Sequence, residues 1–133
     1  MKKTIVKIAI LIAMWIGCLC YVKAQTFTSS VNSVYKWEKN TWKLESFTDD
    51  PVKIKVSGNR TIVYAKETWI YSMYNYLGET KDDDVIQGVW KAIDDGGVKC
   101  AMILKYTNNE KITFSFMYSN LMYQYDIFLY KLK

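Results

Sequence analysis

The sequence predicts an all-β domain, an antiparallel meander of eight or nine strands. Apolar and polar side chains alternate with period two over several short runs, which is typical of half-buried strands. Clusters of Asn, Asp and Gly separate these runs, and no window beyond the N-terminal segment combines helical periodicity with helix caps. Because curling removes the unpaired edges of a long meander, we expect a barrel or a strongly curved sheet, with a two-sheet β-sandwich as the alternative.

The most regular part of the chain is residues 85–130, which predict four strands joined by three tight turns. Loops at residues 95–97, 108–110 and 119–120 place apolar side chains opposite one another, whereas a slip of one residue would turn a core face to water. The predicted cross-strand pairs are Trp90 with Met102, Ala92 with Cys100, Tyr106 with Ile112, Leu104 with Phe114, Phe116 with Tyr123, and Phe114 with Tyr125.

The loop at residues 95–97 gives the sharpest structural prediction. A three-residue loop, with Gly97 in the left-handed conformation, places Trp90 and Cys100 on one face and Lys91 and Lys99 on the other. A two-residue loop would instead bury Lys91 beside Cys100, and an unpaired buried ammonium costs several kcal/mol. Burying Trp90 there adds about 2–3 kcal/mol of apolar stabilisation. Cys100 is accordingly interpreted as an unreactive buried thiol.

The first 24 residues predict a secretory signal peptide, which leaves residues 25–133 as a single domain. Lys2 and Lys3 form a basic start, residues 8–22 are apolar, and Ala24 precedes Gln25 at a suitable cleavage point. The apolar stretch is short for a membrane-spanning helix. An uncleaved anchor and a lipoprotein modified at a signal cysteine are the alternatives. We therefore expect a secreted or periplasmic protein that meets the membrane only during export.

The net charge of the mature chain argues against nucleic-acid binding. The full chain has 18 basic and 13 acidic residues, but four lysines and no acidic residue lie in the signal, which leaves 14 basic residues. Most of the excess positive charge therefore lies in the signal. The mature chain lacks the strong positive charge that would indicate a nucleic-acid interface. Cys100 is the single cysteine after residue 24, so the mature chain has no intramolecular disulfide.

The remainder of the domain predicts further hairpins. Residues 25–33 are expected to form an extended lead-in. Residues 33–48 predict a hairpin that turns at residues 39–40 and pairs Trp37 with Trp42 and Tyr35 with Leu44. A bulge is expected near residues 45–46. A strand over residues 52–56 should return at residues 58–59 into residues 61–65, with Ile62 and Tyr64 inward. Residues 67–76 predict either a bent continuation of that strand or a central strand, and residues 77–84 the longest loop.

The sequence contains few of the residue types and motifs on which enzyme catalysis usually depends. Histidine is absent, which removes the most common general base and most zinc sites, and no phosphate-binding glycine loop is present. The adjacent aspartates at residues 82–84 lack calcium-loop spacing, and Asp94 and Asp95 are interpreted as solvated turn residues. Glu67 and Asp126 could form a carboxylate pair, but nothing in the sequence brings them together. We therefore expect no enzyme activity, no metal and no cofactor.

Aromatic residues supply the candidate binding sites. Residues 67–76 are aromatic on both faces, so that one face is expected to look away from the core, and the candidates there are Trp69, Tyr71, Tyr74 and Tyr76. Met117 and Met122 form a second candidate patch beside Ala101, which the lead-in at residues 25–33 could cover. The alternative for each aromatic residue is a role in the core of a small barrel.

Two motifs carry a resemblance to other proteins. The first comprises Trp90, Ala92, Asp94, Gly96, Gly97 and Cys100, and the second comprises residues 117–123. Together they resemble a group of small uncharacterised secreted proteins of Gram-negative bacteria, which are similar in a signal ending in Ala-Gln, a Trp-to-Cys hairpin and a closing aromatic hairpin. The resemblance covers residues 85–130 and the signal, and it implies no known activity.

These observations favour a non-enzymatic domain that binds a protein or a glycan through exposed aromatic side chains. A carrier of small hydrophobic ligands, of the kind built in eight-stranded barrels, is the alternative from a different class, and it requires an internal cavity. Inhibition of a cell-wall hydrolase is a third option, but no individual residue supports it.

Overall fold

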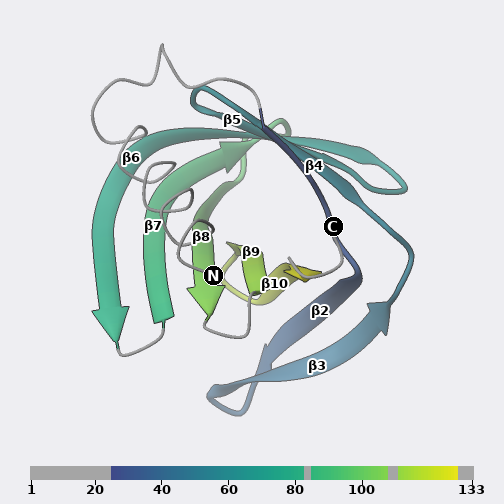
Figure 1. The fold of residues 1–133 in the computed structure, drawn as a ribbon. Coiled ribbons are helices and arrows are strands. Elements are labelled where there is room, and N and C mark those ends of the chain that lie inside the picture. Colours follow the sequence, from purple (N-terminus) through teal and green to yellow (C-terminus); the bar gives the residue numbers. More distant parts are fainter. Residues whose placement is uncertain (1–24, 83–84, 108–110, 129–133) are drawn as a thin grey trace.

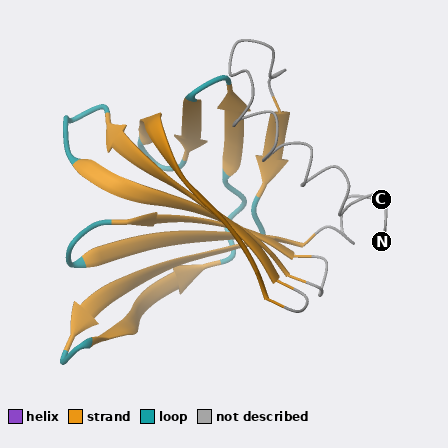
Figure 2. Ribbon diagram, turned by 90° about the vertical axis from the view of Figure 1, so that its left-hand side faces the viewer, coloured by secondary structure: helices purple, strands orange, loops and turns teal. Residues whose placement is uncertain are grey.

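The computed structural model describes residues 25–82, 85–107 and 111–128, and these residues form one curled antiparallel sheet (Figure 1). The strands are β1 (Gln25–Thr28), β2 (Val31–Glu38), β3 (Thr41–Thr48), β4 (Lys53–Ser57), β5 (Arg60–Tyr64), β6 (Thr68–Asp82), β7 (Val85–Asp94), β8 (Lys99–Thr107), β9 (Lys111–Met117) and β10 (Leu121–Phe128). Figure 2 shows strands joined by short loops throughout this part of the chain. The predicted all-β, strongly curved fold is confirmed. The predicted signal peptide lies outside the described residues.

The order of the strands explains the curl. Strands β4 to β10 lie side by side in sequence order. At one end of this run β1 pairs with β4, and at the other end β2 pairs with β10 and β3 pairs with β2. The backbone N–H of Ser29 donates to the carbonyl of Val52 at 2.8 Å, and that of the next residue, Ser30, donates to the carbonyl of Asp126 at 2.8 Å. One short segment thus bonds to both ends of the run β4–β10, which draws the sheet into a half-barrel.

The lead-in at residues 25–33 is part of the sheet, because it forms β1 and the start of β2. This addition is one reason why the described residues contain ten strands rather than the predicted eight or nine. It also means that the lead-in does not lie as a cover across the sheet. No helix in the described part of the chain is long and apolar enough to cross a membrane.

The predicted register around residues 95–97 is confirmed. Trp90 pairs with Met102, and Ala92 pairs with Cys100. The N–H of Asp94 donates to the carbonyl of Val98 at 2.9 Å, which closes a three-residue loop, and Gly97 has a φ of 86°. Lys91 and Lys99 are exposed, whereas Trp90 is 3% exposed. Cys100 shares the face of Trp90 but is half-buried rather than fully buried.

The other predicted hairpin registers are also confirmed. Their cross-strand pairs are Tyr106 with Ile112, Leu104 with Phe114, Phe114 with Tyr125, Phe116 with Tyr123, Trp37 with Trp42, and Tyr35 with Leu44. The predicted bulge is present, because the register between β2 and β3 shifts at Val34 and Tyr35 and leaves Glu45 unpaired. The loop at residues 108–110 lies outside the described residues.

The predicted inward face of β5 is wrong. Thr61 and Val63 are fully buried, whereas Ile62 is half-buried and Tyr64 is 42% exposed. The cause is the short turn at residues 58–59, which pairs Val56 with Thr61. Directly opposed residues share a face of an antiparallel pair, so the inward face of β4 determines which residues of β5 point inward.

The predicted loop over residues 77–84 is also wrong, because β6 continues to Asp82; residues 83–84 lie outside the described part. Residues 60–64 of β5 pair only with residues 68–72 of β6, so the far half of β6 pairs with β7 alone. Register shifts between Met73 and Asn75 and between Tyr76 and Gly78 interrupt the alternation there. Pairing with β7 overrides the weak strand propensity of this polar segment.

The core lies inside the curl and joins strands that are not sheet neighbours. The rings of Tyr71 (β6) and Phe116 (β9) stack at 3.9 Å between centroids, and the rings of Phe27 (β1) and Phe114 (β9) meet at 5.4 Å. Both phenylalanines of β9 are fully buried. These contacts across the interior show that β6, β9 and β1 face one another around one apolar core.

Candidate functional site

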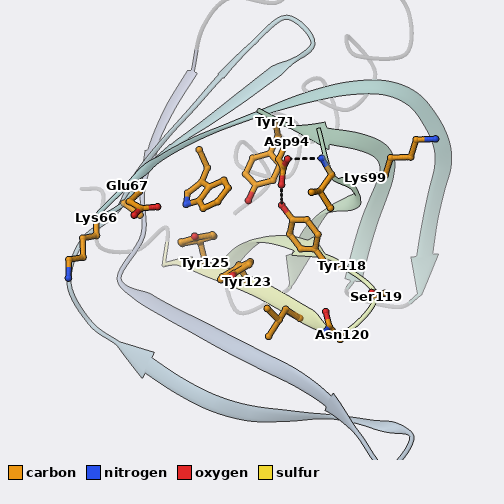
Figure 3. A pocket seen from close by; sticks show the side chains of 14 residues that line it. Lys66, Glu67, Tyr71, Asp94, Lys99, Tyr118, Ser119, Asn120, Tyr123 and Tyr125 are labelled. Atoms are coloured by element: carbon orange, nitrogen blue, oxygen red, sulfur yellow. Dashed lines mark hydrogen bonds between the residues drawn. The ribbon is translucent and has the colours of Figure 1, made fainter. Parts of the chain in front are cut away.

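A cavity of about 630 Å³ opens at one end of the curled sheet. Its walls come from the β5–β6 connection, the start of β6, the β7–β8 turn, the β9–β10 turn and β10 (Figure 3). These connections meet because alternate turns of an antiparallel meander lie at the same end of the sheet. The cavity therefore combines side chains that are far apart in the sequence.

Five aromatic side chains dominate the walls: Trp69, Tyr71, Tyr118, Tyr123 and Tyr125. Phe116 supports two of them from the core, because Tyr71 stacks on it and Tyr125 meets it edge-on at 6.1 Å. Tyr118 and Tyr123 form a perpendicular pair at 6.1 Å. Aromatic rings packed in this way have few alternative rotamers, so the cavity has a preformed apolar surface.

Asp94 is the buried carboxylate of the cavity, with 8% of its surface exposed. Its Oδ1 accepts hydrogen bonds from the backbone N–H groups of Gly96 at 3.0 Å and Val98 at 2.9 Å. Its Oδ2 accepts a hydrogen bond from the Tyr118 hydroxyl at 2.7 Å (Figure 3). The interpretation of Asp94 as a solvated turn residue is therefore wrong, because the side chain turns inward and organises the loop.

These hydrogen bonds keep Asp94 ionised. Burial is the largest influence and raises the pKa of Asp94, but the hydrogen bonds from the Val98 backbone, Tyr118, and the Gly96 and Gly97 backbones together lower the pKa below its ordinary value of 3.8. The site thus holds a negative charge at neutral pH although the carboxylate is almost inaccessible to water.

Tyr118 connects Asp94 to the rest of the cavity wall. Tyr118 also lowers the pKa of Tyr71 and of the Cys100 thiol, although burial outweighs this effect in both. Burial, followed by the hydrogen bonds to Tyr71 and Asp94, raises the pKa of Tyr118, and burial likewise raises the pKa of Tyr71. Burial raises the pKa of Tyr125 to about 12. The phenols therefore stay protonated at neutral pH.

Apart from Asp94, the charged groups of the cavity lie at its mouth. Lys66, Glu67 and Lys99 are exposed, and Figure 3 shows Lys66 and Lys99 extending away from the cavity on opposite sides. Ser119 and Asn120 of the β9–β10 turn complete the polar rim. The charged rim lies in water, so its electrostatic contribution to binding is small and screened by salt.

A smaller hollow of about 150 Å³ adjoins the main cavity, because Tyr123 and Tyr125 line both. Its other walls come from β2 and β3 and include hydroxyl groups of Ser33, Ser46 and Thr48. The concave surface thus continues from the aromatic cavity towards the β2–β3 hairpin.

The structure separates the predicted aromatic candidates of β6. Trp69 and Tyr71 line the cavity. Tyr74 is 54% exposed and does not line it. Tyr76 packs against Trp90 at 4.9 Å, and its buried hydroxyl has no hydrogen-bond partner in the part of the chain that the structure describes. Only two of these four side chains are therefore brought together.

The predicted methionine patch forms on the opposite face of the sheet. Met117 pairs with both Ala101 and Met122, as the register predicts, and all three side chains are half-buried. Because side chains alternate along a strand, Met122 points away from the face that carries Tyr123. Met117 and Met122 are thus separate from the cavity.

Sequence reasoning missed Asp94, Tyr118, Tyr123 and Tyr125 as site residues. A signal was present, because a tyrosine on a predicted core face needs a partner for its hydroxyl, and Tyr123 and Tyr125 both lie on such a face. The partner of Tyr118 is Asp94, which lies 24 residues earlier in the chain. Nothing in the sequence pairs these two residues.

The two carboxylates considered for catalysis do not face each other. Glu67 lies at the mouth of the cavity. Asp126 lies on the outer face of β10, where its Oδ1 accepts a hydrogen bond from the Thr113 hydroxyl at 2.8 Å. Among the described residues, no group of three or more Cys, Asp and Glu side chains is placed to hold a metal ion.

We expect the Cys100 thiol to react slowly in the folded protein. Burial is the main cause that raises the pKa of Cys100 to about 11, so the thiolate is about 100-fold scarcer than at the ordinary value of 9.0. A chromogenic disulfide reagent at mildly alkaline pH should label the native protein at least about 100-fold more slowly than the denatured protein. Similar rates in the two states would contradict this prediction.

No family model matches the chain, and neither a curated protein nor a solved structure matches it.

Proposed function

We propose that this protein is a non-enzymatic binding protein that takes a small, ring-containing or apolar ligand into the aromatic cavity. The observation that carries the proposal is the cavity itself, whose volume of about 630 Å³ lies within the range of about 300–1,000 Å³ that small-molecule sites occupy. A largely apolar wall with a few fixed polar groups is the usual composition of such sites. Of the functions that the sequence suggests, the carrier of small ligands fits this geometry best.

The aromatic composition of the wall supports a ligand with flat or apolar faces. Tyrosine and tryptophan rings bind aromatic rings by offset or edge-on packing and bind the apolar faces of sugar rings by stacking. Trp69 and Tyr123 lie in the wall and are half-buried, so each has ring surface to cover when a ligand enters.

The state of Asp94 supports binding rather than catalysis. Both of its oxygens accept hydrogen bonds from the protein, so neither is positioned as a general base or a nucleophile for a substrate. The sequence contains no histidine to take that role. Export by the N-terminal signal remains part of the proposal and places the binding site outside the cytoplasm.

Filling the mouth of the cavity tests this function. Ala65 lines the cavity and is half-buried, so Ala65→Trp should occupy part of the ligand space. We expect the wild-type protein to bind the fluorescent probe N-phenylnaphthylamine, and the affinity to fall at least about tenfold in Ala65→Trp. Fluorescence titration measures both values.

Tyr64→Trp is the matched control, because Tyr64 is the adjacent residue, is 42% exposed and does not line the cavity. It adds the same chromophore outside the site and should leave probe affinity unchanged. Absence of probe binding to the wild-type protein would overturn the proposal. Equal affinity in Ala65→Trp would place the bound probe outside the cavity.

The β2–β3 hairpin favours a second candidate function, the recognition of a glycan at the surface. Strand β3 ends the sheet order, and the hairpin exposes 44% of Trp37 and 70% of Phe47. Trp37 and Trp42 form an edge-on pair at 5.2 Å. Exposed tryptophan faces of this kind stack on sugar rings.

A glycan array separates the two candidates. If the hairpin binds sugars, Trp37→Ala should abolish the signals that the wild-type protein gives, while Trp69→Ala in the cavity should not. The opposite pattern would assign sugar binding to the cavity. A Trp37→Ala profile identical to that of the wild-type protein would show that the hairpin is not a glycan site.

A further inference from the structure

The wall of the cavity holds a negative charge that no described side chain neutralises. The Asp94 carboxylate lines the cavity and is 8% exposed. It accepts hydrogen bonds from the N–H groups of Gly96 and Val98 and from the Tyr118 hydroxyl. These donors are neutral, so they stabilise the charge without cancelling it. Among the residues that the structure describes, Asp94 takes part in no ion pair.

The two lysines of the cavity do not supply the missing positive charge. Lys66 and Lys99 are exposed at the rim and extend away from the cavity (Figure 3), and Glu67, which is also exposed there, offsets one of them. Water and salt screen exposed charges strongly, whereas a buried charge is screened much less. The charge that a ligand meets inside the cavity is therefore that of Asp94.

The aromatic rings of the wall favour positive charge as well. The face of an aromatic ring is negative and attracts a cation that lies within about 6 Å of the ring centroid, most strongly for tryptophan. Trp69, Tyr118 and Tyr123 line the cavity and are half-buried, which leaves part of each side chain uncovered. The planes of Tyr118 and Tyr123 are perpendicular, with centroids 6.1 Å apart (Figure 3). These two rings thus present surfaces in different directions.

We propose that the cavity binds ligands that carry a weakly hydrated organic cation, such as a trialkylammonium group, on an apolar or ring-bearing body. The inference rests on the proposed function and specifies its ligand class. A quaternary ammonium has no N–H group that loses a hydrogen bond to water on entry, and its charge is spread over alkyl groups that pack against aromatic rings. The uncompensated carboxylate and the ring faces both attract such a group, without a direct hydrogen bond to it.

Two probes that differ in one atom test the inference. Phenyltrimethylammonium and tert-butylbenzene have the same shape, but the first has a positively charged nitrogen where the second has a carbon. Their affinities are measured by displacement of N-phenylnaphthylamine at high ionic strength, which screens the charges of the rim. Because the cation is far costlier to remove from water, an uncharged apolar cavity prefers tert-butylbenzene. For the wild-type protein we expect phenyltrimethylammonium to bind at least as tightly as tert-butylbenzene.

Two variants remove the two sources of attraction separately. Asp94→Asn removes the charge with little change in shape, so the affinity for phenyltrimethylammonium should fall at least about tenfold, while that for tert-butylbenzene changes by less than about twofold. Trp69→Leu keeps an apolar side chain but removes a ring. Both probes then lose contact with the wall, and the affinity of the cation relative to the neutral probe should fall roughly threefold.

Asp95→Asn is the matched control, because it makes the same chemical change at the next residue, which is exposed and does not line the cavity. It should leave both affinities unchanged, and thermal melting verifies that each variant is folded. The inference is overturned if tert-butylbenzene binds the wild-type protein more tightly than phenyltrimethylammonium. It is also overturned if the ratio of the two affinities is unchanged in folded Asp94→Asn or in folded Trp69→Leu. Binding of tert-butylbenzene alone would leave the proposed function standing, whereas failure of both probes to bind would overturn both.

Discussion

Replacing Asp94 with alanine is expected to lower the free energy of unfolding by about 2–4 kcal/mol. The substitution removes the acceptor for the N–H groups of Gly96 and Val98 and for the hydroxyl of Tyr118. Hydrogen bonds to an ionised, buried carboxylate are stronger than those between neutral groups, and the loss leaves the Tyr118 hydroxyl without its acceptor. Urea unfolding followed by tryptophan fluorescence measures the difference.

Asp95→Ala is the matched control. Asp95 occupies the next position of the same turn and is exposed, so its removal should change stability by less than about 0.5 kcal/mol. A loss as small as this in Asp94→Ala would show that the carboxylate does not hold the β7–β8 turn in place.

The contribution of Asp94 should disappear in acid. Its pKa in the folded protein is lower than its ordinary value, because hydrogen bonds outweigh the effect of burial. A depressed pKa adds stability above the unfolded-state pKa, and this stability is lost as the pH falls through the folded-state pKa. The difference between the wild-type protein and Asp94→Ala should therefore be constant near neutrality and shrink below about pH 4. A difference independent of pH would contradict this assignment.

Replacing Phe116 with alanine is expected to cost about 3–5 kcal/mol of stability and to disrupt the cavity. Phe116 is fully buried, stacks on Tyr71 at 3.9 Å and meets Tyr125 edge-on at 6.1 Å. Its removal takes away buried apolar surface and leaves a void that the surrounding strands fill only in part. The two tyrosines that it supports line the cavity, so probe binding should weaken in any folded fraction.

Phe47→Ala makes the same chemical change at a site that is 70% exposed and should alter stability by less than about 0.5 kcal/mol. Denaturant melts of the two variants give the comparison. A similar, small effect at both positions would mean that the interior of the curl is loosely packed around Phe116.

Local pattern was sufficient to predict the hairpins. The turn at residues 95–97 has two possible loop lengths, and only one of them places Trp90 opposite Met102 without burying Lys91. The requirement that apolar side chains face one another across a hairpin also predicts the pairs of the β8–β9 and β9–β10 hairpins. The same rule holds at the turn of residues 58–59, which pairs Val56 with Thr61 and therefore turns Thr61 and Val63 inward rather than the predicted Ile62 and Tyr64.

The sequence by itself determined the fold class, the pairings across the β2–β3, β7–β8, β8–β9 and β9–β10 hairpins and the absence of histidine chemistry, because alternation and turn length are local properties. The cavity depended on the curl. Trp69, Asp94, Tyr118 and Tyr125 lie on four different segments, and they meet only because β1 and β2 bond to opposite ends of the run β4–β10. Tertiary structure also decided that Asp94 turns inward, since the hydroxyl that binds it belongs to another hairpin. Such contacts depend on how far the sheet bends, and bending is the sum of small twists and bulges along every strand, which no single residue pattern encodes.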